Sequence, residues 1–278
     1  MGKPMARNLK RAGADVVVHN RSQAPMEELA AEGMRVAATP AETAMRSGTV
    51  ITMLTDTSAL EKVIAGKSGI LEAAGPDTLV IDMSTAKMLT TKELAARIKK
   101  CGGAYVDAPV SGGTIGAKQG NMSIMAGGDE SALARAMPIL KVLGGKVTHV
   151  GGIGAGQVVK AANQVIVGLT ICAVAEALVL AKHAGVDPAK VRKALGGGFA
   201  DSKILEVHGQ RMIEDSFLPG ARSTVQRKDM DQALELAATL GIELPATSLS
   251  RDLYDNLIAM GHGDLDHAAL IKAIDPDA

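Results

Sequence analysis

The fold is decided by the stretch TLVIDMSTAKMLTTKELAARIKKCGGAYVD, residues 78–107. It begins with an unbroken apolar run at 78–83, continues through helical spacing at 90–100, and ends in a second apolar run at 104–107. A strand, a helix and a strand in this order form a βαβ unit with two parallel strands. Because such strands are buried on both faces, they are apolar throughout instead of alternating. The stretch therefore predicts a parallel sheet covered by helices on both faces.

The same alternation extends over the first half of the chain. Further strands are expected at residues 15–19, 49–54, 122–126 and 146–150. Further helices are expected at residues 5–12, 24–32, 40–46, 58–64 and 130–143. Strands that alternate with helices are typical of α/β proteins with a doubly wound, Rossmann-type sheet. Because the chain runs straight into a helix, the first strand of such a sheet is expected to be absent.

The second half of the chain changes character after Gly156. A long helix, apolar on nearly all sides, is expected at about 156–183, and shorter helices follow at 188–195, 202–213, 228–240, 247–260 and 267–274. We expect a dinucleotide-binding Rossmann domain over 1–152, truncated at its N-terminus. An all-α domain for substrate binding and dimerisation is expected over 153–278. A helix that is apolar on every face is buried on every face, which predicts a homo-oligomer, either a dimer or a tetramer.

Composition argues against several classes of partner. The 278 residues carry 30 Lys and Arg against 30 Asp and Glu, and this scattered, balanced charge offers no footprint for nucleic acid. Two Tyr, two Phe and no Trp are too few to build a platform for stacking bases. The most apolar stretch, residues 161–175, is expected to be too short and too polar to span a membrane, which takes about 20 apolar residues.

Cysteine and histidine usage favours a cytoplasmic protein without a metal site. Cys101 and Cys172 are too few for a disulfide framework, and both are expected to be small buried apolar side chains. The first residues contain no apolar core of a signal peptide. The six histidines show no metal-ligand spacing, since His262 and His267 have no cysteine nearby.

The segment His19-Asn20-Arg21-Ser22 ends the first expected strand. It follows Gly2 at about the spacing that separates a dinucleotide fingerprint from the residue that binds the adenosine ribose. An acidic residue there would bind the 2′-hydroxyl of NAD, whereas Arg21 suits the 2′-phosphate of NADP. The alternative is that Arg21 is a surface residue of a turn.

Two further segments carry residues suited to a small acidic substrate. Ser111-Gly112-Gly113 follows a strand, and its glycines would let backbone N–H groups approach a carboxylate, although a tight structural turn has the same composition. Lys160 and Asn163 are three residues apart and share one face of the long helix. Desolvation lowers the pKa of an amine toward neutrality, as a general acid or base requires. The alternative is that Lys160 extends to solvent from the first helical turn.

Four stretches, taken in order, resemble the β-hydroxyacid dehydrogenase family. They are residues 1–13, with Gly2 as the third glycine of the fingerprint; Asp-Ala-Pro-Val-Ser-Gly-Gly at 107–113; Gly-Ala-Gly-Gln-Val-Val-Lys-Ala-Ala-Asn at 154–163; and Lys228-Asp229. Two more, at 197–202 and 217–220, resemble the semialdehyde reductases of this family. The resemblance implies an NAD(P)-dependent oxidoreductase. It would reduce a small acid of the tartronate, glyoxylate or succinic semialdehyde type, or oxidise the matching 3-hydroxy acid.

The resemblance also implies roles for single residues. Lys160 would give a proton to the carbonyl oxygen, Asn163 would orient the substrate, and Ser111-Gly112-Gly113 would hold its carboxylate. NADP(H) is favoured over NAD(H). Cofactor contacts are implied for Met1, Gly2, Asn20, Arg21, Ser22, Leu54, Thr55, Thr85 and Lys228, with Ser84 and Asp229 close by. Thr55 stands where the family has proline.

The chain departs from the family at its start, where about eleven residues with a strand and two glycines would precede Gly2. This departure leaves open a non-catalytic scaffold or a truncated, inactive product as the alternative function. An imine reductase, which has the same architecture, is disfavoured because those enzymes usually lack a lysine at the position of Lys160.

Overall fold

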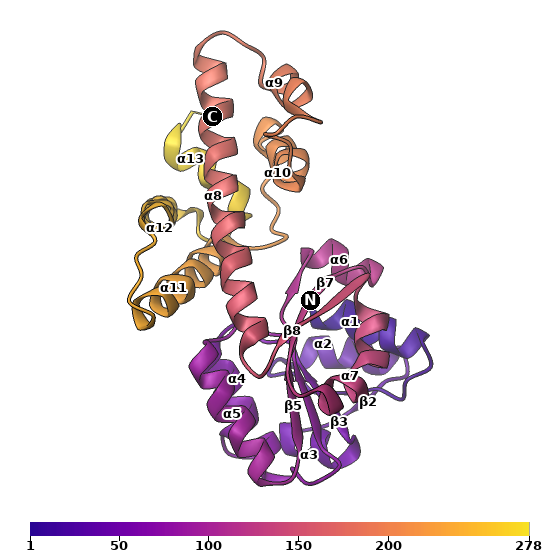
Figure 1. Ribbon diagram of the computed structural model, residues 1–278. Coiled ribbons are helices and arrows are strands. Elements are labelled where there is room, and N and C mark those ends of the chain that lie inside the picture. Colours follow the sequence, from indigo (N-terminus) through magenta and orange to yellow (C-terminus); the bar gives the residue numbers. More distant parts are fainter. Residues whose placement is uncertain (278) are drawn as a thin grey trace. The chain divides into compact units, whose positions relative to one another are not determined.

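The computed structural model describes residues 1–277 and divides into two compact units, Met1–Lys160 and Ala161–Ala278 (Figure 1). The division falls inside α8 (Ala155–His183), the longest helix of the described chain. The sequence expectation placed the boundary at 152/153, ahead of this helix. The first turns of α8 thus belong to the α/β unit, and the rest of α8 to the helical unit.

The α/β unit is built on a six-stranded sheet with the order β3-β4-β5-β7-β6, in which β8 also pairs with β7. Strands β3, β4 and β5 are parallel and in register, so that Thr52 pairs with Asp82 and Asp82 with Asp107. The stretch at 78–107 forms β4-α5-β5, as the sequence predicted. The strands are β3 (Thr49–Thr52), β4 (Leu79–Asp82), β5 (Ala104–Asp107), β6 (Val110–Ser111), β7 (Ser123–Gly127) and β8 (Lys146–Gly151).

Strands β1 (Val17–Val18) and β2 (Arg35–Val36) form a separate parallel pair. A doubly wound sheet has the strand order 3-2-1-4-5-6. In the numbering of that order, β1 corresponds to strand 2, β2 to strand 3 and β3 to strand 4. The family resemblance implies a strand before Gly2, and in this order it would lie between β1 and β3. Within residues 1–277 no strand joins these two, and the sheet is split at this place.

Seven helices of the described chain precede α8, and two of them, α3 and α4, begin with a side-chain cap. Thr39 accepts a hydrogen bond from the Glu42 amide at the start of α3, and Asp56 accepts one from Ala59 at the start of α4. Lys3 of α1 pairs with Glu28 of α2 at 2.6 Å. The helices are α1 (Gly2–Arg11), α2 (Gln23–Ala31), α3 (Pro40–Arg46), α4 (Thr57–Ala65), α5 (Met88–Lys100), α6 (Gly113–Gln119) and α7 (Glu130–Leu143), with a 3-10 turn at Ile70–Glu72.

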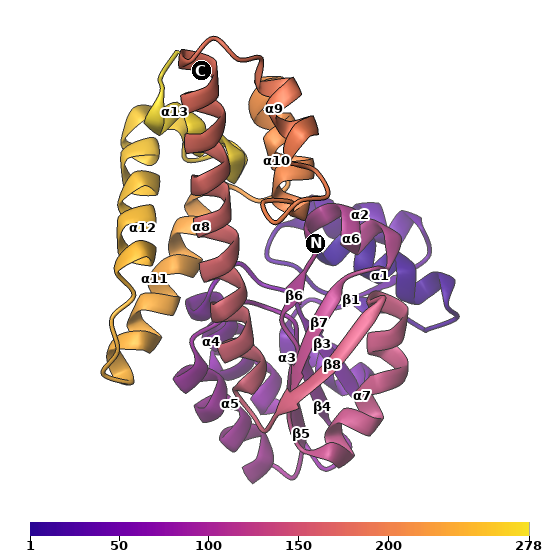
Figure 2. The ribbon, with the colours of Figure 1, turned by 45° about the horizontal axis from the view of Figure 1, so that its top comes forward.

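The helical unit packs its helices around the central part of α8 (Figure 2). Ile171, Val174 and Leu178 of α8 share a buried core with Met230 of α11 and Tyr254 of α12. Its described residues contain no strand, only an isolated bridge between Arg222 and Asp266. The elements are α9 (Pro188–Leu195), α10 (Lys203–Ile213), α11 (Ser223–Thr239), α12 (Pro245–Leu257), a π turn (Ile258–His262), a 3-10 turn (His267–Leu270) and α13 (Ile271–Ile274).

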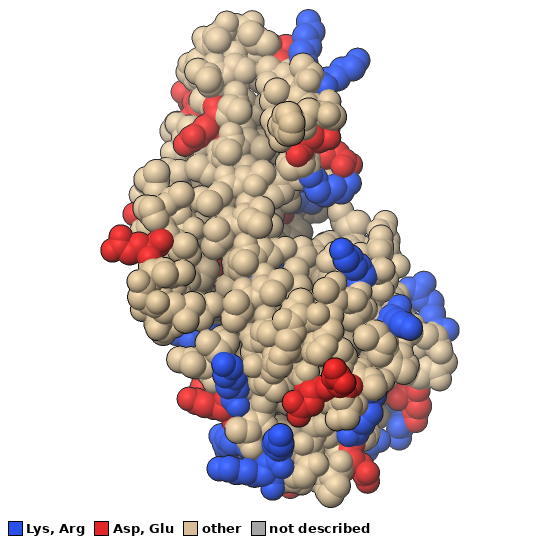
Figure 3. Space-filling model, in the orientation of Figure 1, with Lys and Arg blue, Asp and Glu red and all other residues tan. Residues whose placement is uncertain are grey.

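Helix α8 is less buried than its composition predicts. Ile166 is 65% exposed and Leu180 73% exposed, so burial on every face is not found in the single chain. The surface over α8 is almost free of charged side chains in Figure 3. By length and composition α8 could cross a membrane, although a core helix of a soluble protein passes the same test. The apolar helix extends beyond residues 161–175, the stretch on which the expectation of no membrane span was based.

Cys101 corrects another expectation, because it is exposed. It caps the C-terminus of α5, where the chain turns at the surface. Cys172 on α8 is half-buried, and desolvation raises the pKa of its thiol to about 11. Both cysteines are free.

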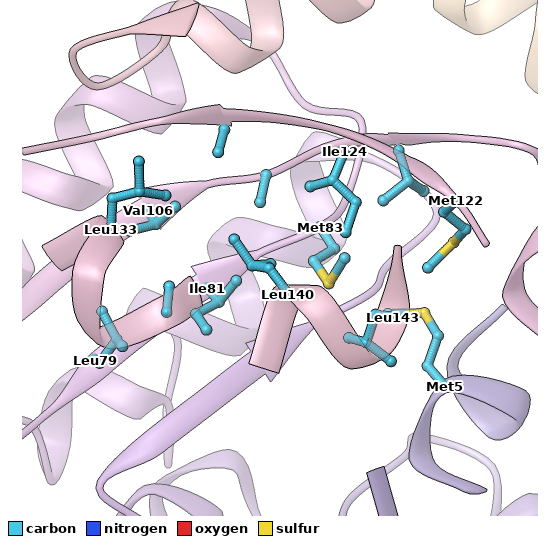
Figure 4. Packing of buried hydrophobic residues seen from close by; sticks show 14 of the residues in the cluster. Met5, Leu79, Ile81, Met83, Val106, Met122, Ile124, Leu133, Leu140 and Leu143 are labelled. Atoms are coloured by element: carbon cyan, nitrogen blue, oxygen red, sulfur yellow. The ribbon is translucent and has the colours of Figure 1, made fainter. Parts of the chain in front are cut away.

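The core of the α/β unit shows why both faces of the sheet are covered. Successive side chains of a strand point to opposite faces. Leu79, Ile81 and Met83 therefore join one buried cluster, while Val80 joins the other. Figure 4 shows the first cluster, in which Leu140 and Leu143 of α7 and Met5 of α1 lie with the side chains of the sheet. The fold is a Rossmann-like α/β unit followed by a helical unit, and the predicted fold class is confirmed.

Candidate active site

The carboxyl ends of β3, β4 and β5 form one polar edge of the sheet. Their paired last residues are Thr52, Asp82 and Asp107, and all three are buried. Ligands of open α/β sheets bind outside the carboxyl ends of the strands. The loops that leave this edge carry Leu54 and Thr55 after β3, Ser84 and Thr85 after β4, and Ser111 to Gly113 farther along.

Asp82 organises the loops after β3 and β4. Its Oδ1 accepts hydrogen bonds from Thr52 Oγ1 at 2.7 Å and from the Ser84 amide at 3.0 Å. Ser84 Oγ in turn accepts a bond from the Leu54 amide at 3.0 Å. Desolvation raises the pKa of Asp82 above its ordinary value, although the hydrogen bonds from Ser84 and Thr52 oppose the rise. Two loops expected at the cofactor are thereby tied together.

Asp107 fixes the beginning of α8. Its Oδ1 accepts the Gly154 amide at 2.8 Å, and its Oδ2 accepts the Gln157 amide at 3.0 Å. A Cβ on Gly156 would lie 2.7 Å from the Asp107 carbonyl oxygen, so only glycine allows this close approach. Burial raises the pKa of Asp107 to about 7, against the lowering by these two amides. The helix that carries Lys160 is therefore anchored to the end of β5.

Gln157 makes a second set of hydrogen bonds between α8 and the edge of the sheet. Its Oε1 accepts the Ala86 amide at 3.0 Å, and its Nε2 donates to the Ser84 carbonyl at 2.9 Å. Sequence reasoning missed Gln157. The available signal was its position three residues before Lys160, which puts both side chains on one helical face.

Lys160 and Asn163 follow on the same face of α8. Lys160 is only 7% exposed, so its side chain does not extend to solvent as the alternative interpretation required. Asn163 is half-buried, and its Nδ2 donates to Gln164 Oε1 at 2.7 Å. A buried amine can hold and release a proton at a reacting oxygen.

Lys228 and Asp229 lie on α11 within the helical unit. Lys228 Nζ is 2.7 Å from Asp229 Oδ1, and Asp229 Oδ2 accepts a bond from Gln164 Nε2 at 2.7 Å. Gln164 thus connects Asn163 with the Lys228-Asp229 pair. The structure brings together three residues that the sequence had placed in two separate motifs.

The glycines at the start of α6 adopt conformations that other residues rarely take. Gly112 has φ +128° and Gly113 φ +59°. A Cβ on Gly113 would meet nothing within 4 Å, so the backbone and not space requires the glycine. Both interpretations of Ser111-Gly112-Gly113, a structural turn and a carboxylate-binding turn, agree with this geometry.

The start of α1 offers features that fit part of a dinucleotide. The helix begins at Gly2, and its N-cap Met1 has no capping side chain. Unpaired amides at a helix N-terminus attract phosphate. Arg21 is exposed and makes no ion pair among residues 1–277, while Asn20 Nδ2 donates to the Ser22 carbonyl at 3.0 Å. These residues suit the phosphates of a nucleotide.

Thr55 and Thr85 lie in the loops that leave β3 and β4. Thr55 is exposed and its hydroxyl donates to Asp56 Oδ2 at 2.9 Å, whereas Leu54 and Thr85 are half-buried. These positions leave the loop side chains partly accessible at the edge where a nicotinamide ring would be expected.

Comparison with known proteins agrees with this arrangement. Residues 1–151 match the family model of the NAD-binding domain of 6-phosphogluconate dehydrogenase. Residues 154–274 match the model described as NAD-binding of NADP-dependent 3-hydroxyisobutyrate dehydrogenase. The 2-hydroxy-3-oxopropionate reductase of Escherichia coli K12 is 44% identical over 276 residues, covering 99% of this chain and 94% of that protein. The 2-(hydroxymethyl)glutarate dehydrogenase of Eubacterium barkeri is 34% identical, covering 98% and 91%.

Solved structures show the same similarity in three dimensions. The 3-hydroxyisobutyrate dehydrogenase of Mycobacterium tuberculosis, in a structure with L-serine, has a TM-score of 0.89 and 32% identity, covering 99% of this chain and 96% of that one. The 3-hydroxyisobutyrate dehydrogenase of Salmonella typhimurium has a TM-score of 0.88 and 28% identity, covering 98% and 95%.

Fold, sheet edge and comparisons together define an oxidoreductase with an NAD(P)-binding Rossmann unit and a helical unit. Within that class, the chain belongs to the β-hydroxyacid dehydrogenase family, which includes the 3-hydroxyisobutyrate dehydrogenases. The family predicted from the sequence motifs is confirmed.

Proposed function

We propose that the chain reduces a small semialdehyde acid, of the tartronate semialdehyde type, with NADPH, and oxidises the matching 3-hydroxy acid in reverse. The observation that carries the proposal is the buried Lys160, which shares a helical face with Asn163 and is anchored through Asp107 and Gln157. The name of the Escherichia coli relative supports this substrate class. The L-serine of the Mycobacterium tuberculosis structure, itself a 3-hydroxy acid, also supports it.

The proposed mechanism assigns each chemical task to a residue. The nicotinamide cofactor, when bound, supplies the hydride. Lys160 donates a proton to the carbonyl oxygen as negative charge develops there, and its ammonium stabilises that charge. Asn163 orients the Lys160 ammonium and, in the oxidising direction, accepts a hydrogen bond from the substrate hydroxyl. Backbone amides of Ser111, Gly112 and Gly113 hold the carboxylate.

The proposed cofactor contacts divide among the two units. In the α/β unit, the start of α1 would hold the pyrophosphate, and Arg21 with Asn20 and Ser22 would hold the 2′-phosphate. The loops after β3 and β4 would contact the nicotinamide. In the helical unit Lys228 contributes a positive charge. The proposed residues are Met1, Gly2, Asn20, Arg21, Ser22, Leu54, Thr55, Thr85 and Lys228.

A titration of the full chain with NADPH and NADH, followed by cofactor fluorescence, tests the first part of the proposal. With no Trp in the sequence, the protein background is low. We expect saturable binding that is tighter for NADPH, and Arg21→Ser should remove most of the difference. Failure of both cofactors to bind would favour the non-catalytic scaffold, the alternative that the split sheet leaves open.

A panel of substrates tests the second part. We expect turnover of tartronate semialdehyde, glyoxylate and succinic semialdehyde to differ, with the best kcat/KM for the first. Methyl esters of the same compounds serve as controls, because loss of the carboxylate should raise KM if the Ser111 turn binds it. Equal KM for acid and ester would contradict that role.

We also propose that the enzyme is a cytoplasmic homo-oligomer, a dimer or tetramer. The exposed apolar side chains of α8, Ile166 and Leu180 among them, support association, since such residues are stabilised by removal from water. Both cysteines are free, which suits a reducing compartment. Light scattering that gives a monomer mass of 28.5 kDa at micromolar concentration would contradict the oligomer.

A further inference from the structure

A continuous chain of polar side chains runs through the interior of the helical unit. It begins at Asn163 and Gln164 on α8, crosses to Gln226 on α11, and ends at a histidine pair beside Asp266. Gln164, Gln226, Asp266 and His267 are all buried. The contacts are Asn163 Nδ2 to Gln164 Oε1 at 2.7 Å, Gln164 Nε2 to Gln226 Oε1 at 3.1 Å, Gln226 Oε1 to His267 Nδ1 at 3.4 Å, His267 Nε2 to His208 Nε2 at 3.3 Å, and His208 Nδ1 to Asp266 Oδ1 at 3.4 Å.

The direction of every bond at the α8 end follows from one backbone carbonyl. The Gln164 carbonyl can only accept, so the Gln226 atom 3.2 Å from it is the amide nitrogen. The other Gln226 atom is then the oxygen, which accepts from Gln164 Nε2. The Asp229 carboxylate also accepts from Gln164 Nε2, at 2.7 Å, which agrees with this orientation.

The remaining amide atoms are then determined. Gln164 presents its Oε1 to Asn163, so the Asn163 atom that contacts it is the nitrogen Nδ2. Asn163 must therefore direct its carbonyl oxygen Oδ1 elsewhere. A substrate hydroxyl and a lysine ammonium are both donors, and both require an acceptor.

The pair formed by His267 and His208 continues this series of hydrogen bonds. Gln226 Oε1 only accepts, which places a proton on His267 Nδ1. At the far end of the pair, His208 Nδ1 faces Asp266 Oδ1 at 3.4 Å, within ion-pair distance. The two Nε2 atoms face one another at 3.3 Å, so one of them carries a proton and donates to the other.

The groups around Asp266 keep its carboxylate ionised. Burial would raise its pKa, but the hydrogen bond from His208, the charge at His267 and the guanidinium of Arg211 hold its pKa well below the ordinary value. Arg211 Nη1 lies 2.5 Å from Asp266 Oδ2, and the Gly220 amide donates to the same oxygen at 2.8 Å. His208, Asp266 and His267 lie within metal-ligand distance of one another, but Arg211 already holds the cationic position.

We propose that Gln164, Gln226 and the His267–His208 pair are positioning residues that hold the Asn163 amide so that its oxygen, and not its nitrogen, faces the reacting group. The proposal rests on the proposed function, in which Asn163 meets the substrate. Without the chain, the Asn163 amide could rotate by 180° and present a donor to donors, so productive geometry would be populated less often.

Nitrogen-15 NMR of the histidine rings in the full-length wild type tests the arrangement without using turnover. We expect Nδ1 of His267 to be protonated, and the His267→Asn variant identifies the His267 signals. An unprotonated His267 Nδ1 would reverse the bond direction and overturn the proposal. This measurement keeps its meaning even if no semialdehyde is reduced, which would instead refute the proposed function.

Kinetics of three variants then test the consequence. His267→Leu removes the donor to Gln226, whereas the Nδ2 of His267→Asn replaces Nδ1 in the same place. Tyr254→Phe is the matched control, because Tyr254 donates to the His267 backbone carbonyl at 3.2 Å without joining the side-chain chain.

We expect kcat to fall about tenfold in His267→Leu, with KM within about twofold of wild type, and to recover most of the loss in His267→Asn. Tyr254→Phe should keep the wild-type kcat. If His267→Leu matches Tyr254→Phe in kcat, or if His267→Asn is as slow as His267→Leu, the proposal is wrong. Thermal unfolding of each variant confirms that the compared proteins are folded.

Discussion

Asp107 in the α/β unit and Asp266 in the helical unit are buried carboxylates with opposite electrostatics. Both accept backbone amides, Asp107 from Gly154 and Gln157, and Asp266 from Gly220 and Ala268. Burial raises the pKa of Asp107 to about 7. The pKa of Asp266 is held well below its ordinary value, because its hydrogen bond from His208, the charge at His267 and Arg211 outweigh burial.

The difference shows that amides alone do not offset desolvation, whereas cations do. Asp82, beside Asp107, is a second carboxylate whose negative charge raises the pKa of Asp107 further. The α/β unit therefore places two carboxyl groups of raised pKa at the edge where the active site is proposed. The helical unit instead surrounds its buried carboxylate with basic side chains, as suits a structural support for Asn163.

The largest effect on stability is expected from Asp266→Asn. This change removes the anion beside the buried His267 and the half-buried Arg211 and His208, and we expect a cost of about 3–5 kcal/mol of unfolding free energy. Urea unfolding at pH 7 measures the loss. A loss below about 1 kcal/mol would mean that the cations do not depend on Asp266, and the contrast between the two carboxylates would disappear.

A smaller but still large effect is expected from pH on the α/β unit. The folded pKa of Asp107 lies above its value of 3.8 in the unfolded chain, so the folded state binds more protons between these two values. Stability of this unit should therefore fall as the pH rises from about 4 to about 7, by up to about 4 kcal/mol.

The helical unit should respond in the opposite direction and at lower pH. Because the folded pKa of Asp266 is lowered, its contribution is present above about pH 4 and is lost as the pH falls further. Each unit contains one tyrosine, Tyr105 in the α/β unit and Tyr254 in the helical unit. Near-UV circular dichroism of Tyr105→Phe and of Tyr254→Phe then follows the two units separately. Parallel pH profiles would contradict the account.

The Asp107→Asn variant sharpens the comparison further. Asparagine offers one acceptor oxygen where Asp107 offers two, so one amide at the start of α8 loses its partner at a cost of about 1–3 kcal/mol. The dependence of stability on pH between about 4 and 7 should shrink in the same variant. If the stability of Asp107→Asn depends on pH as strongly as that of the wild type, a group other than Asp107 causes the dependence.

Sequence patterns predicted most of the α/β elements because each depends on local order. The apolar runs of β4 and β5 and the helical spacing of α5 were found within a few residues of their ends. The missed elements lack such local signals. Arg35 and Val36 of β2 are exposed, and α6 begins with Gly113 and contains Gly116, a residue type that weakens helices.

The sequence predicted the site residues that lie in local motifs. It did not predict residues whose contacts form only when distant segments of the chain come together. Lys160 and Asn163 share a motif on one helix. Gln157, in contrast, contacts Ala86, which lies 71 residues away in the chain, and Gln164 contacts Gln226 at a separation of 62. A single sequence does not show which distant residues contact one another, so the roles of Gln157 and Gln164 could not be predicted from it.

Single-turnover reduction of tartronate semialdehyde by wild type and by Lys160→Ala, each saturated with NADPH, tests the central claim most directly. Lys160→Arg serves as a control that keeps the charge but does not readily release a proton. We predict a rate lower by a factor of about 10²–10⁴ in Lys160→Ala, with cofactor binding unchanged. A Lys160→Ala rate within a factor of about two of wild type would contradict the role of Lys160 as the proton donor.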